Sequence, residues 1–148
     1  LGLLFYGIRV ARQKGEAWQQ NRQAGEAYWQ QKQQQDGVQQ VGDGVLVEYL
    51  QRGDGDVSPT LKQPIVVHYT GTLIDGTVFD CSRRRGEPLK FSLNQVIAGW
   101  QQGMQQLVVG DRVRLTIPQQ LAYGRRQAGA IPPYSTLIFD VELLSIES

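Results

Sequence analysis

The sequence is poor in the side chains on which most enzyme chemistry depends. Its 148 residues include one cysteine, Cys81, and one histidine, His68. A single cysteine cannot form a disulfide within the chain, so an oxidising compartment is neither required nor excluded. A single histidine cannot supply a His-based triad or a multi-histidine metal site. We therefore expect Cys81 to be packed in the core and His68 to be a hydrogen-bonded structural residue.

The motifs of several reaction classes are also missing. There is no glycine-rich phosphate loop ending in Lys-Ser or Lys-Thr, no Gly-x-Ser-x-Gly sequence, and no paired-cysteine or His-Glu-x-x-His spacing. Asp54 and Asp56 resemble the start of a calcium loop, but the downstream acidic ligand is absent, so we expect a turn there. The formal net charge of +1 gives no global attraction to nucleic acid. We expect no metal, no cofactor and no nucleic-acid partner.

Long apolar runs are absent as well. Residues 1–8 are largely apolar and are followed by Arg9, Arg12 and Lys14, but spanning a bilayer takes about 20 apolar residues. Two interpretations stay open: the end of a longer signal or membrane anchor upstream of Arg9, or the apolar start of a helix that packs on the domain or on a partner. The basic flank of an anchor would favour the cytoplasmic side, yet the compartment stays undecided.

The composition changes sharply near residue 44, which predicts two parts of the chain. Residues 9–40 are rich in Gln, with Ala, Glu and Arg, and lack proline. This composition predicts a helix, weakened at Gly15 and Gly25 by about 1 kcal/mol each. We expect a helical arm over residues 1–43 and a main domain over residues 44–148.

The arm carries large apolar side chains that a lone helix cannot bury. Trp18, Tyr28 and Trp29 lie in an otherwise polar segment, so they are expected to dock either on a second copy of the chain or back on the main domain. The heptad pattern is too poor to predict a coiled coil. Residues 30–40 are interpreted as a solvated helix end or a linker.

The main domain has the alternating pattern of a β-rich fold. A two-residue turn at Asp75-Gly76 predicts a hairpin between two of its strands. The strand segments expected from alternation and β-branched content are residues 45–50, 65–73, 78–79, 89–92, 112–117 and 136–146.

One helix is predicted between these strands. Ser92 and Gln95 fit a capping box, and Gly110 is expected to end the helix. One face of the helix carries apolar residues at i, i+4, i+8 and i+11, which are Val96, Trp100, Met104 and Leu107. Gly99 and Gly103 weaken the helix and are expected to let a sheet approach it closely. The predicted fold class is α+β, an antiparallel β-sheet wrapped around one short α-helix and preceded by an N-terminal helical extension.

A set of aromatic and aliphatic side chains occupies positions that can line one pocket, together with one acid, Asp80. From the residues alone, an ordinary hydrophobic core explains these positions better than a pocket does. The set comprises Tyr69, Phe79, Val96, Ile97, Trp100, Tyr123, Ile131 and Phe139.

Five motifs in register resemble the FKBP-type peptidyl-prolyl cis-trans isomerases over about residues 44–147. They are His68-Tyr69-Thr70-Gly71 with Asp75-Gly76 and Phe79-Asp80-Cys81-Ser82, then Val96-Ile97-Ala98-Gly99-Trp100, Leu121-Ala122-Tyr123-Gly124, Ile131-Pro132-Pro133, and the run from Thr136 to Leu143. Each motif alone is modest, but five in the same order and spacing are highly specific. The resemblance implies an isomerase that accelerates rotation of X-Pro bonds without a covalent intermediate.

The resemblance also implies a set of site residues. The catalytic ones are Tyr69, Asp80 and Tyr123. The substrate-binding ones, with Trp100 as the floor of a proline pocket, are Phe79, Leu89, Val96, Ile97, Trp100, Ile131 and Phe139. The chain departs from the family at Leu89, where many members have phenylalanine, in the shorter loop of residues 124–130, and at Cys81, which replaces the usual serine.

An arm before the domain is similar to that of bacterial isomerases of the Mip and FklB-like group, in which the N-terminal part commonly forms a dimer. The resemblance implies proline-containing polypeptide clients, macrolide inhibitors such as rapamycin, and a homodimer formed through the arm. The alternative to an enzyme is a folding chaperone or binding scaffold that has the same pocket but little turnover.

Overall fold

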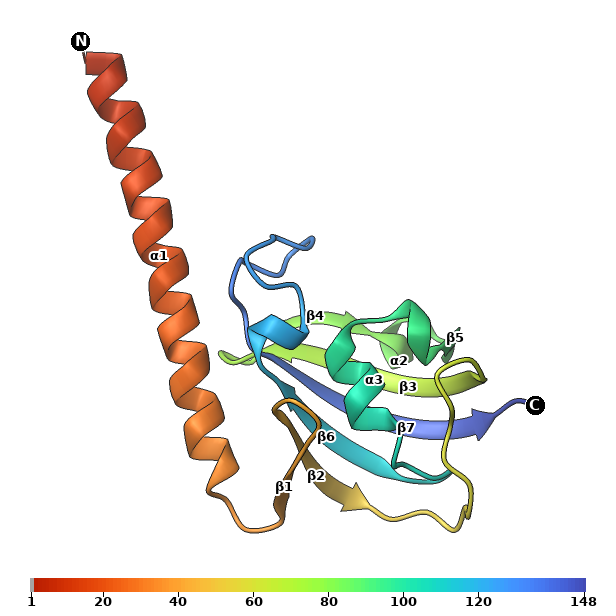
Figure 1. Cartoon of the computed structure of the whole chain (residues 1–148). Coiled ribbons are helices and arrows are strands. Elements are labelled where there is room, and N and C mark those ends of the chain that lie inside the picture. Colours follow the sequence, from red (N-terminus) through yellow and green to blue (C-terminus); the bar gives the residue numbers. More distant parts are fainter. Residues whose placement is uncertain (1) are drawn as a thin grey trace.

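The computed structural model describes the backbone of residues 2–148 and the side chains of residues 13–148. The described residues form a seven-stranded antiparallel sheet that curves around one short helix, with a long helix on its flank (Figure 1). The strands are β1 (Val38–Val41), β2 (Val45–Gln51), β3 (Pro64–Leu73), β4 (Val78–Cys81), β5 (Leu89–Ser92), β6 (Arg112–Ile117) and β7 (Leu137–Ile146). The helices are α1 (Gly2–Gln33), α2 (Ser82–Arg85) and α3 (Ala98–Met104), with short 3₁₀ turns η1 (Leu93–Gln95) and η2 (Gln119–Leu121). The predicted fold class is confirmed.

Alternation along the strands fixes which side chains enter the core. The strand order is β1-β2-β6-β7-β3-β4, and β5 pairs with β3 off that path. Along β7, Leu137, Phe139, Val141 and Leu143 are buried and their neighbours are partly exposed, as the period of two predicted. The predicted hairpin joins β3 to β4, but its loop has three residues, 74–76, closed by the Leu73 N–H bond to the Thr77 carbonyl oxygen, and of Asp75 and Gly76 only Gly76 has a positive φ, 89°.

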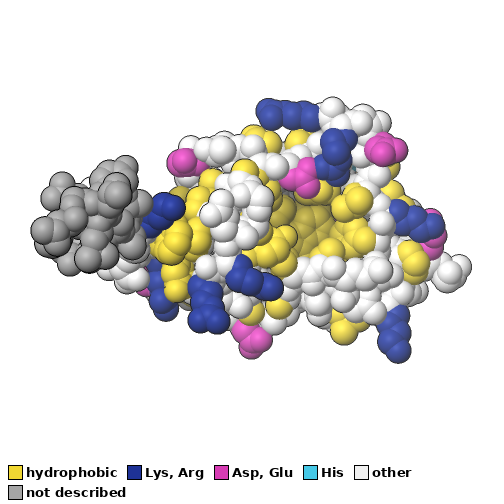
Figure 2. Space-filling model, turned by 90° about the horizontal axis from the view of Figure 1, so that it is seen from above, with side chains coloured by type: hydrophobic (Ala, Val, Ile, Leu, Met, Phe, Trp, Pro, Cys, Tyr) yellow, Lys and Arg dark blue, Asp and Glu magenta, His cyan; other side chains and the backbone are white. Residues whose placement is uncertain are grey.

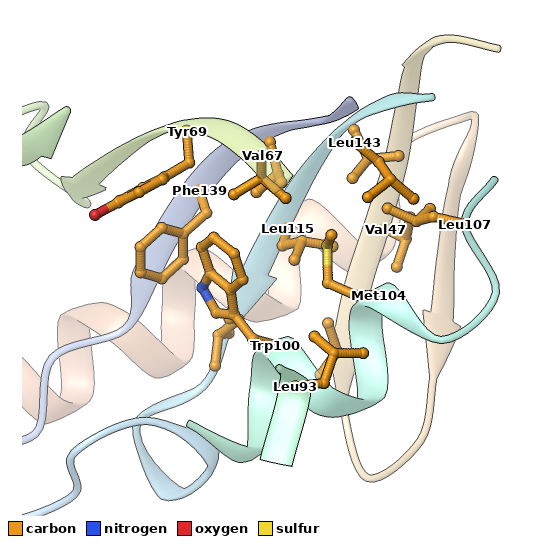
Figure 3. Packing of buried hydrophobic residues seen from close by; sticks show 14 of the residues in the cluster. Val47, Val67, Tyr69, Leu93, Trp100, Met104, Leu107, Leu115, Phe139 and Leu143 are labelled. Atoms are coloured by element: carbon orange, nitrogen blue, oxygen red, sulfur yellow. The ribbon is translucent and has the colours of Figure 1, made fainter. Parts of the chain in front are cut away.

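Helix α3 lies across the concave face of the sheet and completes the core. Trp100, Met104 and Leu107 face the strands, as Figure 3 shows, and each is at most 5% exposed. A Cβ on Gly99 would lie 2.3 Å from Ile117 Cγ2, and one on Gly103 would lie 3.1 Å from Leu115. The two glycines therefore allow the close helix–sheet contact that the sequence predicted.

The predicted helix is interrupted near its start. The capping box of Ser92 and Gln95 is present, but it begins the 3₁₀ turn η1 and not α3. Val96 and Ile97 then adopt extended backbone before α3 begins at Ala98. Two consecutive β-branched residues disfavour helix, and their extended backbone separates η1 from α3. Helix α3 ends at Met104, so Gly110 belongs to the turn before β6 and does not end the helix.

Helix α1 packs back on the main domain through its C-terminal half. The indole Nε1 of Trp29 donates a hydrogen bond of 2.7 Å to the carbonyl oxygen of Gly44, and the Lys32 ammonium lies 3.2 Å from the Glu48 carboxylate. Trp18, further along the helix, stays 39% exposed. We expected these aromatic residues to dock either on a second copy or on the main domain. Trp29 docks on the main domain of its own chain.

The segment expected to be a helix end or linker contains a strand. Helix α1 ends at Gln33, and Val38–Val41 forms β1, which pairs with β2 at the edge of the sheet. The boundary at residue 44 stays a prediction. No described helix has the length and apolar character needed to cross a membrane. The predicted anchor concerns residues 1–8, whose side chains lie outside the described residues.

Candidate functional site

A cavity of about 460 Å³ opens between α3, β5 and the loops at one end of the sheet. Figure 2 shows it as an apolar hollow with charged groups at its rim. Its walls are mainly aromatic and aliphatic, with two charged side chains and one amide side chain among them. The lining residues are Tyr69, Phe79, Asp80, Leu89, Phe91, Gln95, Val96, Ile97, Trp100, Ala122, Tyr123, Arg126 and Phe139.

Edge-to-face contacts hold the aromatic walls around Trp100. Its ring centroid lies 5.1 Å from that of Phe139, 5.4 Å from that of Tyr69 and 5.4 Å from that of Phe91. Phe79 stands against Phe139 at 5.6 Å with the ring planes 89° apart. These are the preferred geometries of aromatic pairs, so the floor and walls form one rigid cluster. Figure 3 shows Trp100, Tyr69 and Phe139 converging at one end of the core.

The strands explain why these rings meet. Tyr69 and Gly71 are alternate buried residues of β3, and Gly71 pairs with Phe139 of β7. A Cβ on Gly71 would lie 2.5 Å from the Phe79 ring and 2.8 Å from the Phe139 ring. Only glycine at position 71 therefore lets both rings lie over β3. This close packing explains the glycine of the His68-Tyr69-Thr70-Gly71 motif.

A polar network stands at one side of this aromatic cluster. The Tyr69 hydroxyl donates a hydrogen bond to Asp80 Oδ2, and the Arg85 guanidinium donates to Asp80 Oδ1. The Nη2 group of Arg85 also lies 3.2 Å from the Tyr69 oxygen. Burial and the hydrogen bond to Asp80 raise the pKa of Tyr69 above its ordinary value of 10.0. The hydroxyl is therefore a neutral donor at physiological pH, and it binds one oxygen of the Asp80 carboxylate at the cavity wall.

His68 has the structural role that the sequence predicted. Its Nδ1 atom lies 2.8 Å from Oγ of Ser82, which also accepts a hydrogen bond of 2.8 Å from the backbone N–H of Tyr69. Ser82 is fully buried. The pair ties the start of α2 to β3 and thereby fixes the segment that carries Asp80, which lines the cavity, and Arg85, which binds Asp80.

Cys81 differs from its prediction. It is partly exposed and not part of the core, because β4 is a short edge strand that pairs only with β3. Its sulfur lies 3.2 Å from Oγ1 of Thr70. The pKa of the Cys81 thiol is lowered from its ordinary value, mainly by this hydrogen bond to Thr70.

The cavity brings together all of the predicted site residues except one. Ile131 is not among the lining residues; its backbone pairs with Ala128 in the loop, and its side chain packs in the core. Sequence reasoning missed four lining residues, Phe91, Gln95, Ala122 and Arg126. The alternation of Leu89 and Phe91 along β5 was a signal for Phe91, since both point to one face. Among the described residues, no three His, Cys, Asp or Glu side chains gather closely enough to hold a metal ion.

Comparison with known proteins agrees with this geometry. Residues 55–144 match the family model described as FKBP-type peptidyl-prolyl cis-trans isomerase. The chain is 48% identical over 123 residues to the FKBP-type 22 kDa peptidyl-prolyl cis-trans isomerase of Escherichia coli, covering 82% of this chain and 59% of that protein. It is 51% identical over 107 residues to the peptidyl-prolyl cis-trans isomerase Fkbp12 of Drosophila melanogaster, covering 70% of this chain and 99% of that protein.

A solved structure extends the similarity to the helical arm. The crystal structure of FkpA from Escherichia coli matches with a TM-score of 0.89 and 37% identity, covering 99% of this chain and 70% of that chain. The chain thus spans only part of the length of its bacterial relatives. Because the family model covers more than half of the chain and the cavity holds the side chains of its motifs, the chain belongs to the FKBP-type peptidyl-prolyl cis-trans isomerase family.

Proposed function

We propose that this protein is a peptidyl-prolyl cis-trans isomerase that accelerates X-Pro bond rotation during protein folding. The observation that carries the proposal is the aromatic cavity, in which Trp100 is 5% exposed and is surrounded by three further rings. An apolar hollow of this kind fits a pyrrolidine ring. The Tyr69–Asp80 pair lies in the cavity wall, beside the position proposed for the prolyl amide.

The uncatalysed reaction is slow because of amide resonance. Rotation about the C–N bond faces a barrier of about 18–20 kcal/mol, so exchange takes tens to hundreds of seconds. No bond breaks, and no nucleophile is needed. The planar amide is the more polar state, and water stabilises it relative to the twisted transition state. A cavity that removes this water lowers the barrier, and each 1.36 kcal/mol of differential stabilisation gives a tenfold rate increase.

The proposal assigns the lining residues two tasks. Holding the proline ring falls to the apolar residues Phe79, Leu89, Val96, Ile97, Trp100 and Phe139. The polar ones act on the amide. Tyr123 donates its hydroxyl to a substrate carbonyl, and Tyr69 orients Asp80, whose carboxylate biases the electric field around the rotating carbonyl. Ile131 acts only by supporting the loop from within the core.

Partners follow from the same cavity. The family's clients are proline-containing polypeptides, and macrolides such as rapamycin are expected to occupy the hollow and compete with them. The similarity to two Escherichia coli proteins supports a bacterial origin.

We also propose that the arm forms a homodimer and thereby supports client binding in a chaperone-like way. Residues 13–20 of α1 are exposed, and among them Trp18 presents a large apolar group with 39% exposure. Replacement of Trp18 with Gln is expected to shift the protein from dimer to monomer in sedimentation equilibrium. An unchanged mass would remove Trp18 from the interface. Membrane association through the segment upstream of Arg9 stays a prediction, and vesicle co-sedimentation of the chain with and without residues 1–8 tests it.

The proposed activity is tested with a short X-Pro peptide whose cis-trans exchange is followed by NMR, with and without rapamycin. Catalysis that rapamycin abolishes supports the enzyme and locates the reaction in this cavity. If the folded protein binds rapamycin but leaves the exchange rate unchanged, the cavity serves a binding scaffold with little turnover, and the enzyme proposal fails.

A further inference from the structure

One loop connects the cavity with helix α1. We call residues 124–134 the pocket loop. On one side it supplies Arg126, three residues after Tyr123, to the cavity lining. Its base is closed by a hydrogen bond of 2.7 Å from the Tyr134 N–H to the Gly124 carbonyl oxygen, and the Gly124 N–H donates to Gln119 at 2.9 Å. One hydrogen bond therefore connects Tyr134 with Gly124, the residue that follows Tyr123.

The other side of the pocket loop is held by side chains of α1. The amide of Asn21 donates to the Pro133 carbonyl oxygen at 2.8 Å and to Ser135 Oγ at 3.0 Å. The Ser135 hydroxyl in turn donates to the Pro132 carbonyl at 2.8 Å. One helical side chain thus closes a network with Pro132, Pro133 and Ser135 around the end of the loop.

Close backbone packing accompanies these hydrogen bonds. Gly25 lies one helical turn after Asn21, and a Cβ added there would lie 2.4 Å from Thr136 Oγ1 and 3.1 Å from Thr136 Cβ. Thr136 and Ser135 are 5% and 6% exposed. The helix therefore seats directly on the end of the pocket loop, and glycine at position 25 allows it.

The backbone at the contact is strained. Tyr134 is the single non-glycine residue among those described that has a positive φ, 62°. Such a conformation costs free energy and persists where surrounding contacts enforce it. The Arg22 guanidinium lies over the Tyr134 ring at 5.2 Å from its centroid, and Asn21 binds the residues on either side of Tyr134. Helix α1 supplies these contacts.

We propose that α1 clamps the pocket loop, and that Asn21 is a positioning residue for Tyr123 and Arg126 at the cavity. The inference deepens the proposed isomerase function and rests on it. Holding the loop in its substrate-binding arrangement removes the entropy cost of ordering it when a peptide binds. The arm then contributes to catalysis on short peptides, besides any role in dimerisation or client capture.

The chain offers a closely matched pair of variants. Gly25→Ala and Gly15→Ala give the same gain in helix propensity, but only the first collides with Thr136, because a Cβ on Gly15 meets nothing within 4 Å. Asn21→Asp keeps the shape of the side chain but cannot donate to the Pro133 carbonyl. Gln23→Glu makes the same charge change at an exposed position of α1.

The experiment measures kcat and KM on a short X-Pro peptide together with amide hydrogen exchange of residues 124–134. Gly25→Ala and Asn21→Asp are expected to lower kcat/KM by about two- to fivefold, as for loss of one hydrogen bond, mainly through a higher KM. Exchange of the loop amides accelerates in both. Gly15→Ala and Gln23→Glu match the wild type. The double variant Gly25→Ala/Thr136→Ala lacks the 2.4 Å contact with Thr136 Oγ1. Its kcat/KM and loop exchange are expected to return toward those of the Thr136→Ala single variant.

Failure of the clamp and failure of the enzyme are distinguishable. If the wild type catalyses and both helix variants match their controls in kcat/KM, the clamp is overturned, even if loop exchange changes. If the wild type does not catalyse, the proposed function fails. The clamp is then decided by loop exchange and by rapamycin affinity: weaker binding with faster exchange supports it, and unchanged values overturn it.

Discussion

Replacement of Gly71 with alanine tests whether the packing of the aromatic walls governs catalysis. The new Cβ would lie 2.5 and 2.7 Å from atoms of the Phe79 ring and 2.8 Å from the Phe139 ring, where ordinary contacts are 3.4–4 Å. The rings must therefore move by roughly 1 Å. Overpacking costs about 1–3 kcal/mol, and alanine regains about 0.5–1 kcal/mol over glycine in a strand. The net loss is about 0–2.5 kcal/mol, which lowers Tm by up to about 10 °C.

Catalysis is expected to fall further than stability. A displacement of about 1 Å in a site can cost up to about a hundredfold in rate, and we expect kcat/KM of Gly71→Ala to fall by at least about tenfold in the peptide exchange assay. Gly53→Ala is the control, because its Cβ would meet the Val109 carbonyl oxygen at 2.2 Å, away from the cavity lining. It should lower Tm but change kcat/KM by less than about twofold. Equal losses of kcat/KM in the two variants would refute the reasoning.

The remaining predictions concern the polar groups and the rim. Asp80→Ala and Tyr123→Phe are each expected to lower kcat/KM by about three- to thirtyfold without loss of the folded circular dichroism spectrum, and unchanged rates would remove their assigned roles. The pKa of Tyr69 is raised by burial and by Asp80, so its stabilising effect is complete below about pH 10 and is lost as pH rises through the raised pKa. Tyr69→Phe should therefore show a smaller decline of Tm between about pH 9 and 11, and an equal decline argues against this linkage. Leu89 lies at the rim of the cavity and is 37% exposed. Leu89→Phe adds an aromatic ring to this wall, and titration calorimetry should find that the variant binds rapamycin about two- to fivefold more tightly. Weaker binding of rapamycin by Leu89→Phe would show that the cavity has no room for a further aromatic ring at position 89.

The strands were largely predictable from the sequence for a local reason, whereas the cavity was predictable only from the resemblance of its motifs to a known family. Alternation along β3 and β7 sets the buried face without reference to any partner strand, and the Asp75-Gly76 turn sets one pairing. The motifs around Tyr69, Asp80 and Trp100 then assign side chains to one hollow, which the structure describes as a cavity.

Features that depend on contacts between distant segments were not predictable. The strand β1 has only Val38 and Val41 as β-branched residues, and its pairing with β2 decides its conformation. The break at Val96 and Ile97 escapes periodicity, because the apolar spacing continues across it. Arg85 belongs to a run of three arginines that looks like a solvated loop, and only the approach of β4 to β3 brings Asp80 and Arg85 to the Tyr69 hydroxyl.

The central claim is that the cavity accelerates bond rotation by desolvation, with no proton transferred and no bond broken. The most direct measurement is kcat/KM for a short X-Pro peptide in H₂O and in D₂O at matched protonation of the protein. We expect a ratio near one, to within about 20%, because no exchangeable proton is in flight in the transition state. A ratio of about two or more on the catalysed rate, absent from the uncatalysed rate, would contradict the account.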